Sequence, residues 1–375
     1  MIRFFNVMKK NTKDISPFKE ALHDHQLHTS PTLSPKDKHL LKTIQDKTQL
    51  LNKNNIMRTK AYLDYYQKHP EIQWSLLAHM VSRNAGWNMT DLKGEFLPKL
   101  LSPKEQNDFF HMLERGNWLI FQDAFPQLLL YEESKRKQKS LFYLLPYFGV
   151  SVFMKAMWEH FWKEPNQELL SIALIINEQH YIEDRVIQNP TYQQSVLDIL
   201  EFQLQDVLSM NQMLFPCEEN NEIKLVGATV HHFASLYKRI EFGKSLYTLL
   251  FSDKLPFISK WAKNKVHTGS RQDYWSNVFQ DKKEAVPGVS YPPRFKNCSI
   301  SYNYPRFYSP QLSHVWKKVH HTSPQIGDWY HDEAVVDLLN MKGIPFTGEI
   351  KPQYCETLER LDLIVSTKNL IFPKR

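Results

Sequence analysis

The chain has 375 residues, of which 42% are hydrophobic and 23% charged, a composition typical of a folded globular protein with a large core. Only 11 residues are glycine, against 23 Phe, 17 Tyr and 9 Trp. So few glycines argue against nucleotide-binding folds built on glycine-rich turns and against sandwiches of many strands joined by tight turns. Long helices with aromatic side chains between them fit this composition better.

The formal net charge of +7 is unevenly distributed. Residues 1–60 hold 12 Lys or Arg and five Asp or Glu, so the other 315 residues hold 35 of each sign and are neutral. The body of the chain is therefore not basic. Any electrostatic attraction to nucleic acid or to an anionic lipid surface is predicted to reside in residues 1–60.

Three cysteines, Cys217, Cys298 and Cys355, lie far apart in the sequence and are odd in number. Neither a disulfide framework nor a paired-cysteine metal motif is predicted from them, which favours the reducing cytoplasm as the compartment. The N-terminus lacks the apolar stretch of a secretory signal. The most apolar run, residues 141–153, is shorter than the roughly 20 residues of a membrane-spanning helix. We interpret this run as buried core, with peripheral contact to a membrane surface as the alternative.

The N-terminal third begins with a polar, basic arm, residues 1–55, predicted to be partly disordered but to contain one helix over 36–53. From residue 56 apolar side chains recur at three- and four-residue spacing, which predicts helices on either side of Pro70. The side chains of this stripe that we expect in the core are Tyr62, Tyr65, Tyr66, Ile72, Leu76, Leu77 and Met80.

A further helix is marked by a capping box of Ser102 with Glu105, by Pro103 at the first helical position, and by Gly116 as its expected end. The remaining helices predicted in this part of the chain cover 118–137, 151–163, 167–187, 192–213, 224–252 and 271–280. For the last of these, Ser270 and Asp273 are predicted to form a second capping box.

The amino-acid composition changes after residue 280. Residues 281–310 carry five prolines and six aromatic residues, which is too aromatic for a disordered linker, so we predict an ordered loop lying on the helical body. Helices are predicted again at 310–320 and 329–341, and one strand in the tail, residues 360–375. The predicted fold is mainly α, with an arm (1–55), a helical body (56–280) and a C-terminal region of loop and helices packed on that body (281–375).

Residues 79–95, "HMVSRNAGWNMTDLKGE", leave the apolar pattern for a dense set of hydrogen-bonding groups and two glycines. One interpretation is a polar corner in which Gly86 ends a helix and Trp87 folds back on the core. The other is a ligand pocket in which Arg83 holds an anion and Asp91 acts as a base or ligand, both keeping their charged ends toward solvent. The candidate site residues are His79, Arg83, Asn84, Trp87, Asn88 and Asp91.

A second cluster of functional side chains lies downstream, where four histidines fall within 18 residues beside several carboxylates. Imidazole with carboxylate suits zinc or iron. However, adjacent histidines at a helix end do not easily share one ion, and such histidines also complement the helix dipole. We therefore predict no metal or other cofactor, and keep a metal site as the weaker alternative with ligands His314, His320, His321 and His331.

Two strings, "WSLLAHMVSRNAGWNMTDLKGE" and "YSPQLSHVWKKVHHTSPQIGDWYHDE", resemble an uncharacterised family of spore-forming Gram-positive bacteria, the YppC-like family. The resemblance covers most of the chain from about residue 57. It implies no activity, cofactor or catalytic residue.

Function is therefore an open choice between three hypotheses. The leading one is a cytoplasmic, non-catalytic binding or interaction protein with a polar pocket near residues 79–95, taking a protein partner or a small anionic ligand. The alternative is a metal-dependent or hydrolase-like enzyme that uses the same polar corner and the C-terminal histidines. The third is attachment to nucleic acid or to an anionic membrane surface through the basic arm.

Overall fold

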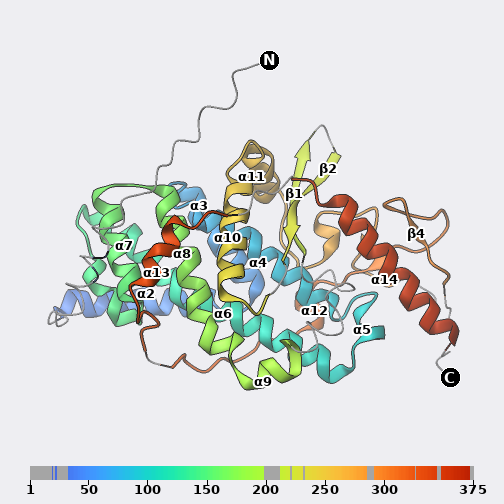
Figure 1. Cartoon of the computed structure of the whole chain (residues 1–375), viewed down its shortest axis with the longest axis horizontal. Helices are drawn as coiled ribbons and strands as arrows, with labels where there is room; N and C mark the ends of the chain where they lie inside the picture. Colours follow the sequence, from blue (N-terminus) through green and yellow to red (C-terminus); the bar gives the residue numbers. More distant parts are fainter. Residues whose placement is uncertain are drawn as a thin grey trace, which may run out of the picture.

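Helices make up most of the molecule in the computed structural model, as predicted (Figure 1). The structure describes residues 19, 22, 33–197, 212–219, 222–230, 233–284, 291–325, 327–343 and 348–371. The division into arm, body and C-terminal region stays a prediction.

The first three helices are α2 (Pro35–Leu51), α3 (Asn55–Lys68) and α4 (Trp74–Asp91). Helix α2 starts with a capping box of Ser34 and Asp37 and packs against the long helix α6. Helices α3 and α4 lie on either side of Pro70, as predicted, and the whole predicted apolar stripe from Tyr62 to Met80 is buried. The prediction that Gly86 ends the helix is wrong, because α4 continues through it to Asp91.

Helix α6 (Pro103–Lys137) follows the short helix α5 (Leu97–Leu100) and begins with the predicted capping box of Ser102 and Glu105. The predicted end at Gly116 is wrong, and the two helices predicted around it are one. A glycine ends a helix by adopting a left-handed conformation. Here Gln138 adopts it instead, with φ 52°, and its main-chain N–H bonds the last carbonyls.

The chain then folds back along α6. The elements are η1 (Phe142–Phe148), α7 (Val152–Lys163), α8 (Gln167–Ile182), η2 (Glu183–Ile187), α9 (Pro190–Tyr192) and η3 (Gln193–Leu197). The predictions at 151–163 and 167–187 are confirmed. The prediction at 192–213 is wrong at its end, where β1 begins, and residues 198–211 lie outside the described part of the chain.

An antiparallel hairpin of β1 (Gln212–Glu219) and β2 (Glu222–Thr229) replaces the first part of the helix predicted at 224–252. Burial explains the difference, because Leu214 and Phe215 of β1 and Leu225 and Val226 of β2 are buried in the hairpin's contacts with the helices. The rest of that prediction holds as α10 (Leu236–Leu250), followed by α11 (Leu255–Asn264).

The C-terminal part has little regular structure before its last helix. Its elements are η6 (Arg271–Asp273), β3 (Phe279–Gln280), β4 (Phe295–Lys296), β5 (Ser299–Ile300), β6 (Phe307–Tyr308), α12 (Leu312–Val315), α13 (Ala334–Asp337), η7 (Leu338–Asn340) and α14 (Lys351–Ile371). The predicted helix at 271–280 is a single turn, and those at 310–320 and 329–341 shrink to α12 and to α13 with η7. The predicted strand in the tail is wrong for residues 360–371, which belong to α14, and residues 372–375 lie outside the described part of the chain.

A disulfide joins Cys298, next to β4, to Cys355 on α14, with 5.2 Å between the Cα atoms. The prediction that the cysteines form no disulfide is therefore wrong. Spacing in the sequence could not reveal this pair, because the two residues are 57 positions apart and the fold brings them together. Cys217 is free and buried in β1.

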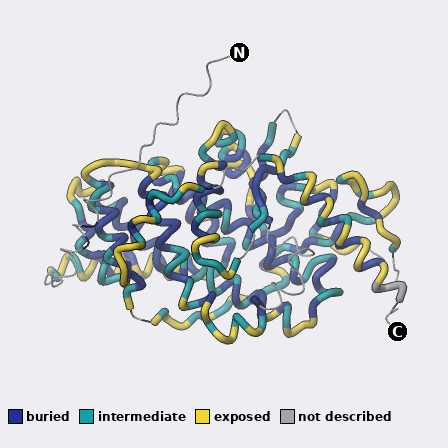
Figure 2. Tube along the Cα trace, in the orientation of Figure 1, coloured by how far each residue is buried: buried dark blue, intermediate teal, exposed yellow. Residues whose placement is uncertain are grey.

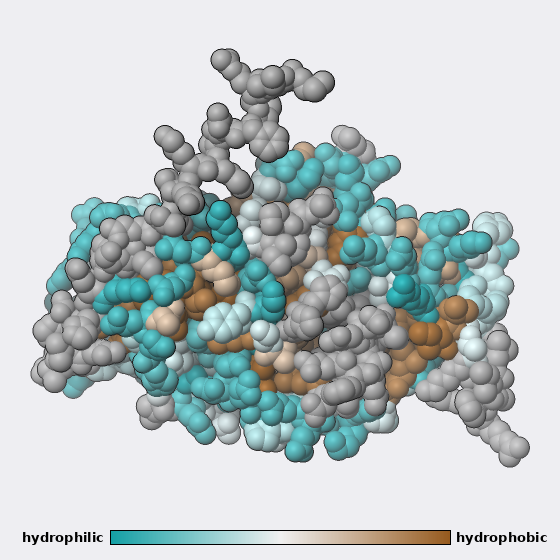
Figure 3. Space-filling model, in the orientation of Figure 1, coloured by the Kyte–Doolittle hydropathy of each residue, from teal (hydrophilic) through white to brown (hydrophobic). Residues whose placement is uncertain are grey.

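Buried residues run through the interior from end to end (Figure 2) and form one contiguous core from Leu22 to Val365. Among the residues coloured in Figure 3, hydrophilic side chains predominate on the face drawn, with smaller hydrophobic patches between them. In the described part of the chain, no helix is long and apolar enough to cross a membrane. The apolar run at residues 141–153 is largely interior, with Leu144, Leu145 and Phe153 buried.

Candidate functional site

The candidate residues of the 79–95 stretch lie on α4, in the centre of the molecule (Figure 1). Gly86 sits inside this helix because two side chains approach it closely. A Cβ atom at this position would lie 2.5 Å from Asn55 Oδ1 and 2.6 Å from His267 Nε2. The glycine therefore allows the segment after α11 to pack against α4.

Arg83 is buried, with 1% of its surface exposed. Its Nε donates to His79 Nε2 at 3.0 Å, and its Nη2 donates to the carbonyls of Ala262 and Lys265 at the end of α11. The guanidinium also lies 4.6 Å from the ring centre of Trp261. Arg83 therefore complements the negative end of the α11 dipole, and the expectation that its charged end faces solvent is wrong.

His79 is a neutral partner of this arginine. Its Nδ1 lies 2.8 Å from the carbonyl of Thr59, and its Nε2 accepts from Arg83, so the proton is on Nδ1. Burial lowers the pKa of His79 well below its usual value, and the charge of Arg83 lowers it further.

Asn84 and Trp87 hold other parts of the chain against α4. The side chain of Asn84 donates to the carbonyl of Leu214 and accepts from its N–H, both at 2.8 Å, which fixes strand β1 to the helix. Trp87 is fully buried and its ring centre lies 4.6 Å from that of Tyr274. Both residues therefore have an evident structural role.

Asn88 and Asp91 meet Arg271 of η6. Nη2 of Arg271 lies 2.6 Å from Asp91 Oδ2 and 3.1 Å from Asn88 Oδ1, while its Nη1 donates to Tyr274 Oη at 2.7 Å. Burial raises the pKa of Asp91, and the guanidinium opposes this shift. The same pair raises the pKa of Arg271, because Asp91 favours the charged form of the guanidinium. This is a paired, buried charge rather than a free base.

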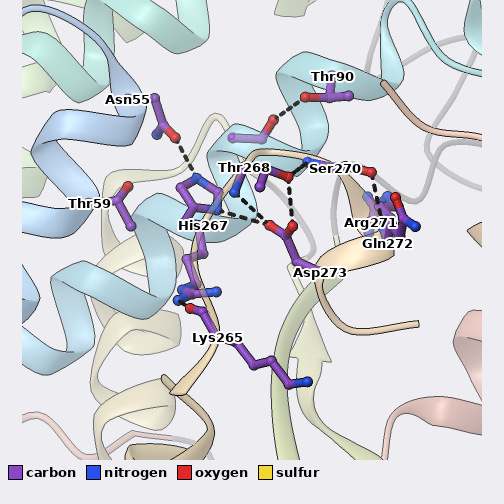
Figure 4. A network of polar contacts seen from close by, with 12 residues as sticks. Asn55, Thr59, Thr90, Lys265, His267, Thr268, Ser270, Arg271, Gln272 and Asp273 are labelled. Carbon is purple, nitrogen blue, oxygen red and sulfur yellow. Dashed lines mark hydrogen bonds and ion pairs between the residues drawn. The ribbon is translucent and has the colours of Figure 1, made fainter. Parts of the chain in front are cut away.

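A chain of polar contacts links α3 to the segment that follows α11 (Figure 4). His267 Nε2 lies 2.8 Å from Asn55 Oδ1, and Nδ1 lies 3.6 Å from Asp273 Oδ2. Asp273 also accepts hydrogen bonds from the main-chain N–H and the hydroxyl of Thr268. Burial lowers the pKa of His267, with Asp273 acting in the opposite direction.

The predicted capping box of Ser270 with Asp273 is wrong. Ser270 Oγ accepts from the N–H of Gln272, whereas the carboxylate of Asp273 is held by Thr268. Sequence reasoning did not assign His267, Arg271 or Trp261 to the site. The string "HTGSRQD", residues 267–273, has a density of polar groups around a glycine similar to that of residues 79–95, and this similarity could have revealed His267 and Arg271 but not Trp261.

A small cleft lies beside Asp91. Its lining residues are Asp91, Glu95, Phe96, Leu97, Arg271, Phe279, Tyr308, Leu358 and Leu361. Its volume is about 20 Å³, room for about one or two water molecules. Of the candidate residues, only Asp91 lines it.

The four downstream histidines are not brought together. His314, His320 and His331 are exposed, whereas the side chain of His321 is largely buried, with Nε2 3.7 Å from Glu114 Oε1. In the described part of the chain, no three His, Cys, Asp or Glu side chains are placed to hold a metal ion. Of the basic arm, residues 1–32 lie outside the described residues except for Lys19 and Leu22, so its contact with nucleic acid or lipid stays a prediction.

Comparison with known proteins identifies the family of this chain. A family model described as "Protein of unknown function (DUF2515)" matches residues 50–345. The chain belongs to this family. It is also 38% identical over 331 residues to "Uncharacterized protein YppC" of Bacillus subtilis (strain 168), covering 88% of this chain and 95% of that protein. No solved structure matches the chain.

Proposed function

We propose that this chain is a non-catalytic binding protein whose ligand is a small anion, such as a carboxylate or an inorganic ion, held at Arg83. Within the described residues, the buried arginines are Arg58, Arg83, Arg239, Arg271 and Arg294. The other four each have a carboxylate oxygen within 4.0 Å, in Glu114, Glu183, Asp91 and Glu95 respectively. No such oxygen lies within that distance of Arg83 in the described part of the chain.

This unbalanced charge is the observation that carries the proposal. Buried charges in proteins are usually paired, because removing an ion from water costs much free energy. Burial lowers the pKa of Arg83 only to about 10, so the guanidinium is a cation at neutral pH. The end of α11 supplies the partial charge of a helix terminus, and Asp273 acts on Arg83 from beyond 4.0 Å, where it favours the charged form. In the described part of the chain the guanidinium therefore has no carboxylate in direct contact, and an anion would supply that contact.

Three N–H donors without partners support the same location. They are Nη1 of Arg83, Nε1 of Trp87 and Nε1 of Trp261. Arg83 and Trp87 are four residues apart on one face of α4, and the ring of Trp261 lies against both. Buried donors are nearly always hydrogen-bonded, and an anion is the acceptor that would also neutralise Arg83.

Access would be through the turn over residues 263–266. Lys265 supplies a carbonyl to Arg83 while its side chain is exposed, and Val266 is 79% exposed. One turn of exposed chain therefore covers the guanidinium. His79, Asn84, Asn88 and Asp91 would position the helix around this site without contacting the ligand.

Thermal unfolding in chloride or formate, compared with bulky gluconate at equal ionic strength, tests the proposal. We expect the small anions to raise the melting temperature of the wild type, because a ligand that binds only the folded state stabilises it. Trp261→Phe, which removes one N–H and keeps an aromatic ring, should reduce this shift, and Arg83→Met should abolish it. Lys265→Gln, a change at an exposed neighbour, should leave it intact. An equal shift in wild type and Arg83→Met would refute the anion site.

We also propose that the protein is cytoplasmic, with peripheral contact to a membrane as the alternative. In a reducing cytoplasm Cys298 and Cys355 would be held mainly as thiols. Trapping thiols with an alkylating agent at cell lysis, followed by mass spectrometry, measures their state. A fully formed disulfide in growing cells would contradict the cytoplasmic location.

A further inference from the structure

A second group of basic side chains contacts a segment that we call the strap, residues 316–325. The strap has no regular secondary structure and follows α12 along the edge of the body (Figure 1). Aromatic contacts hold it in place. Trp316 stacks on Phe110, with ring centres 3.9 Å apart, and His321 stacks on Trp118 at 5.0 Å.

Two arginines bind the strap and its continuation through main-chain carbonyls alone. Arg115 of α6 donates to the carbonyl of Thr322 at 2.8 Å. Arg185 of η2 donates to the carbonyls of Gln325 and Gly327 at 3.4 and 3.2 Å. These bonds are exposed to solvent and their acceptors are neutral, so they are weak compared with a bond to an anion.

Arg115 and Arg185 bind main-chain carbonyls only three residues apart in the strap, those of Thr322 and Gln325. Burial is the main cause that lowers the pKa of Arg115, and the nearby charge of Arg185 lowers it further. Each guanidinium also lies over an aromatic ring, Arg115 4.9 Å from the centre of Trp118 and Arg185 4.2 Å from that of Tyr181. Two like charges at one place cost free energy unless a negative group offsets them.

No carboxylate oxygen lies within 4.0 Å of either arginine in the described part of the chain. At longer range Arg185 interacts with the buried carboxyl of Asp123, where its charge opposes the rise in the pKa of that group. Glu114, which precedes Arg115 on α6, is already paired with Arg58, whose Nη2 lies 2.5 Å from its Oε2. Arg136, on the same helix as Arg115, shows the usual arrangement, with Nη2 2.6 Å from Glu133 Oε2. Arg115 and Arg185 are therefore two planar cations that bind the same strap, and in the described part of the chain neither has a carboxylate in direct contact.

We propose that Arg115 and Arg185 form an oxyanion-binding site for a phosphate-bearing ligand, and that the carbonyls of Thr322 and Gln325 occupy its donors when the ligand is absent. Two planar guanidiniums match the several oxygens of a phosphate or pyrophosphate group. The exposed Lys317 and Lys318 of the strap add to the positive potential around the site. This site shares no residue with the one proposed at Arg83, so each stands or falls separately.

The test is calorimetric titration of the full chain with pyrophosphate. We expect binding by the wild type, and a loss of affinity of about tenfold or more in Arg115→Gln and in Arg185→Gln, because each removes one charged donor. Arg185→Lys, which keeps the charge but not the planar fork, should bind with intermediate affinity. Arg136→Gln on the same helix is the matched control and should bind as the wild type does.

Two further readouts define the site. Hydrogen exchange of a peptide covering residues 317–325 should become faster on pyrophosphate binding, because the ligand displaces the strap carbonyls from the arginines. Vesicles containing phosphatidic acid, tested beside free pyrophosphate, separate a lipid headgroup from a soluble phosphate as the source. Absence of binding to both probes, or equal affinity in the wild type and the two Gln variants, would overturn the proposal.

Discussion

Trp87 and Asp91 lie one turn apart on α4, and each contacts a residue near η6: Trp87 packs on Tyr274, and Asp91 pairs with Arg271. The first contact is apolar and the second is ionic, yet both join α4 to the C-terminal part. The carboxylate of Asp91, which we expected to face solvent, therefore pairs with an arginine inside the molecule. Because Arg271 is only 2% exposed, loss of Asp91 would leave a buried positive charge without its partner.

We predict that Trp87→Ala and Asp91→Ala destabilise the protein to a similar extent. Loss of a large buried aromatic residue costs about 3–5 kcal/mol, and loss of one partner of a buried ion pair costs about 3–5 kcal/mol because the other charge is left uncompensated. Urea unfolding measures both. Tyr302→Ala, at a side chain 90% exposed, serves as the control and should have little effect. A small cost for Asp91→Ala would favour the solvent-facing pocket instead.

Asp123 provides a test by pH. It accepts hydrogen bonds from Asn177 and Gln127, and burial raises its pKa to about 7 despite these bonds. Because the folded pKa is above the unfolded value of about 4, the stability it contributes is fully present below pH 4 and is lost as pH rises through 7.

Asp123→Asn, which mimics the protonated acid, should remove this dependence. We expect the variant to gain stability relative to the wild type between pH 5 and pH 8, by on the order of 3 kcal/mol. Urea unfolding at the two pH values measures the difference in unfolding free energy between the variant and the wild type. His79 and His267 change stability with pH in the opposite direction, but they do so equally in both proteins, so their contributions cancel in this difference. Parallel pH profiles for the two proteins would show that Asp123 is ionised throughout.

At the scale of elements, α14 is attached to the C-terminal region by three kinds of contact. The Cys298–Cys355 disulfide ties it to the β4–β5 hairpin, Asp362 accepts from the N–H groups of Arg294 and Phe295, and Tyr354 is fully buried. This combination explains why the tail is a helix although its sequence was interpreted as a strand. These tertiary contacts, and not the local sequence pattern, stabilise the helix.

We predict that reduction of this disulfide lowers stability by about 2–4 kcal/mol, since it releases a loop of 57 residues in the unfolded chain. Thermal unfolding with and without a reducing agent measures the effect. The double variant Cys298→Ser/Cys355→Ser should be insensitive to the reducing agent. Equal stability of the oxidised and reduced wild type would mean that the disulfide has no stabilising role.

At the scale of the whole molecule, one core connects all the described regions, from Leu22 to Val365. Arg271 with Asp91, and Trp316 with Phe110, join the C-terminal region to the helical body. The regions predicted from composition therefore share one interior in the described part of the chain.

We predict a single cooperative unfolding transition for the full chain, because no part of this core is separate enough to unfold alone. Far-ultraviolet circular dichroism follows the helices, and tryptophan fluorescence follows side chains distributed through the core. The two urea curves should superimpose. A biphasic curve would instead favour the predicted division into body and C-terminal region.

The sequence by itself determined the mainly α fold, the apolar stripe from Tyr62 to Met80, the approximate position of α2 and the start of α6. It could do so because periodicity and helix caps depend on residues three or four positions apart. Only the tertiary structure decided that α4 continues through Gly86, that Arg83 has no carboxylate partner and that Asp91 pairs with Arg271. Each of these depends on a contact with a residue about 180 positions away, such as His267 or Arg271, and local spacing carries no information about such contacts. The candidate stretch could therefore be found from sequence, but the charge balance around each of its residues could not.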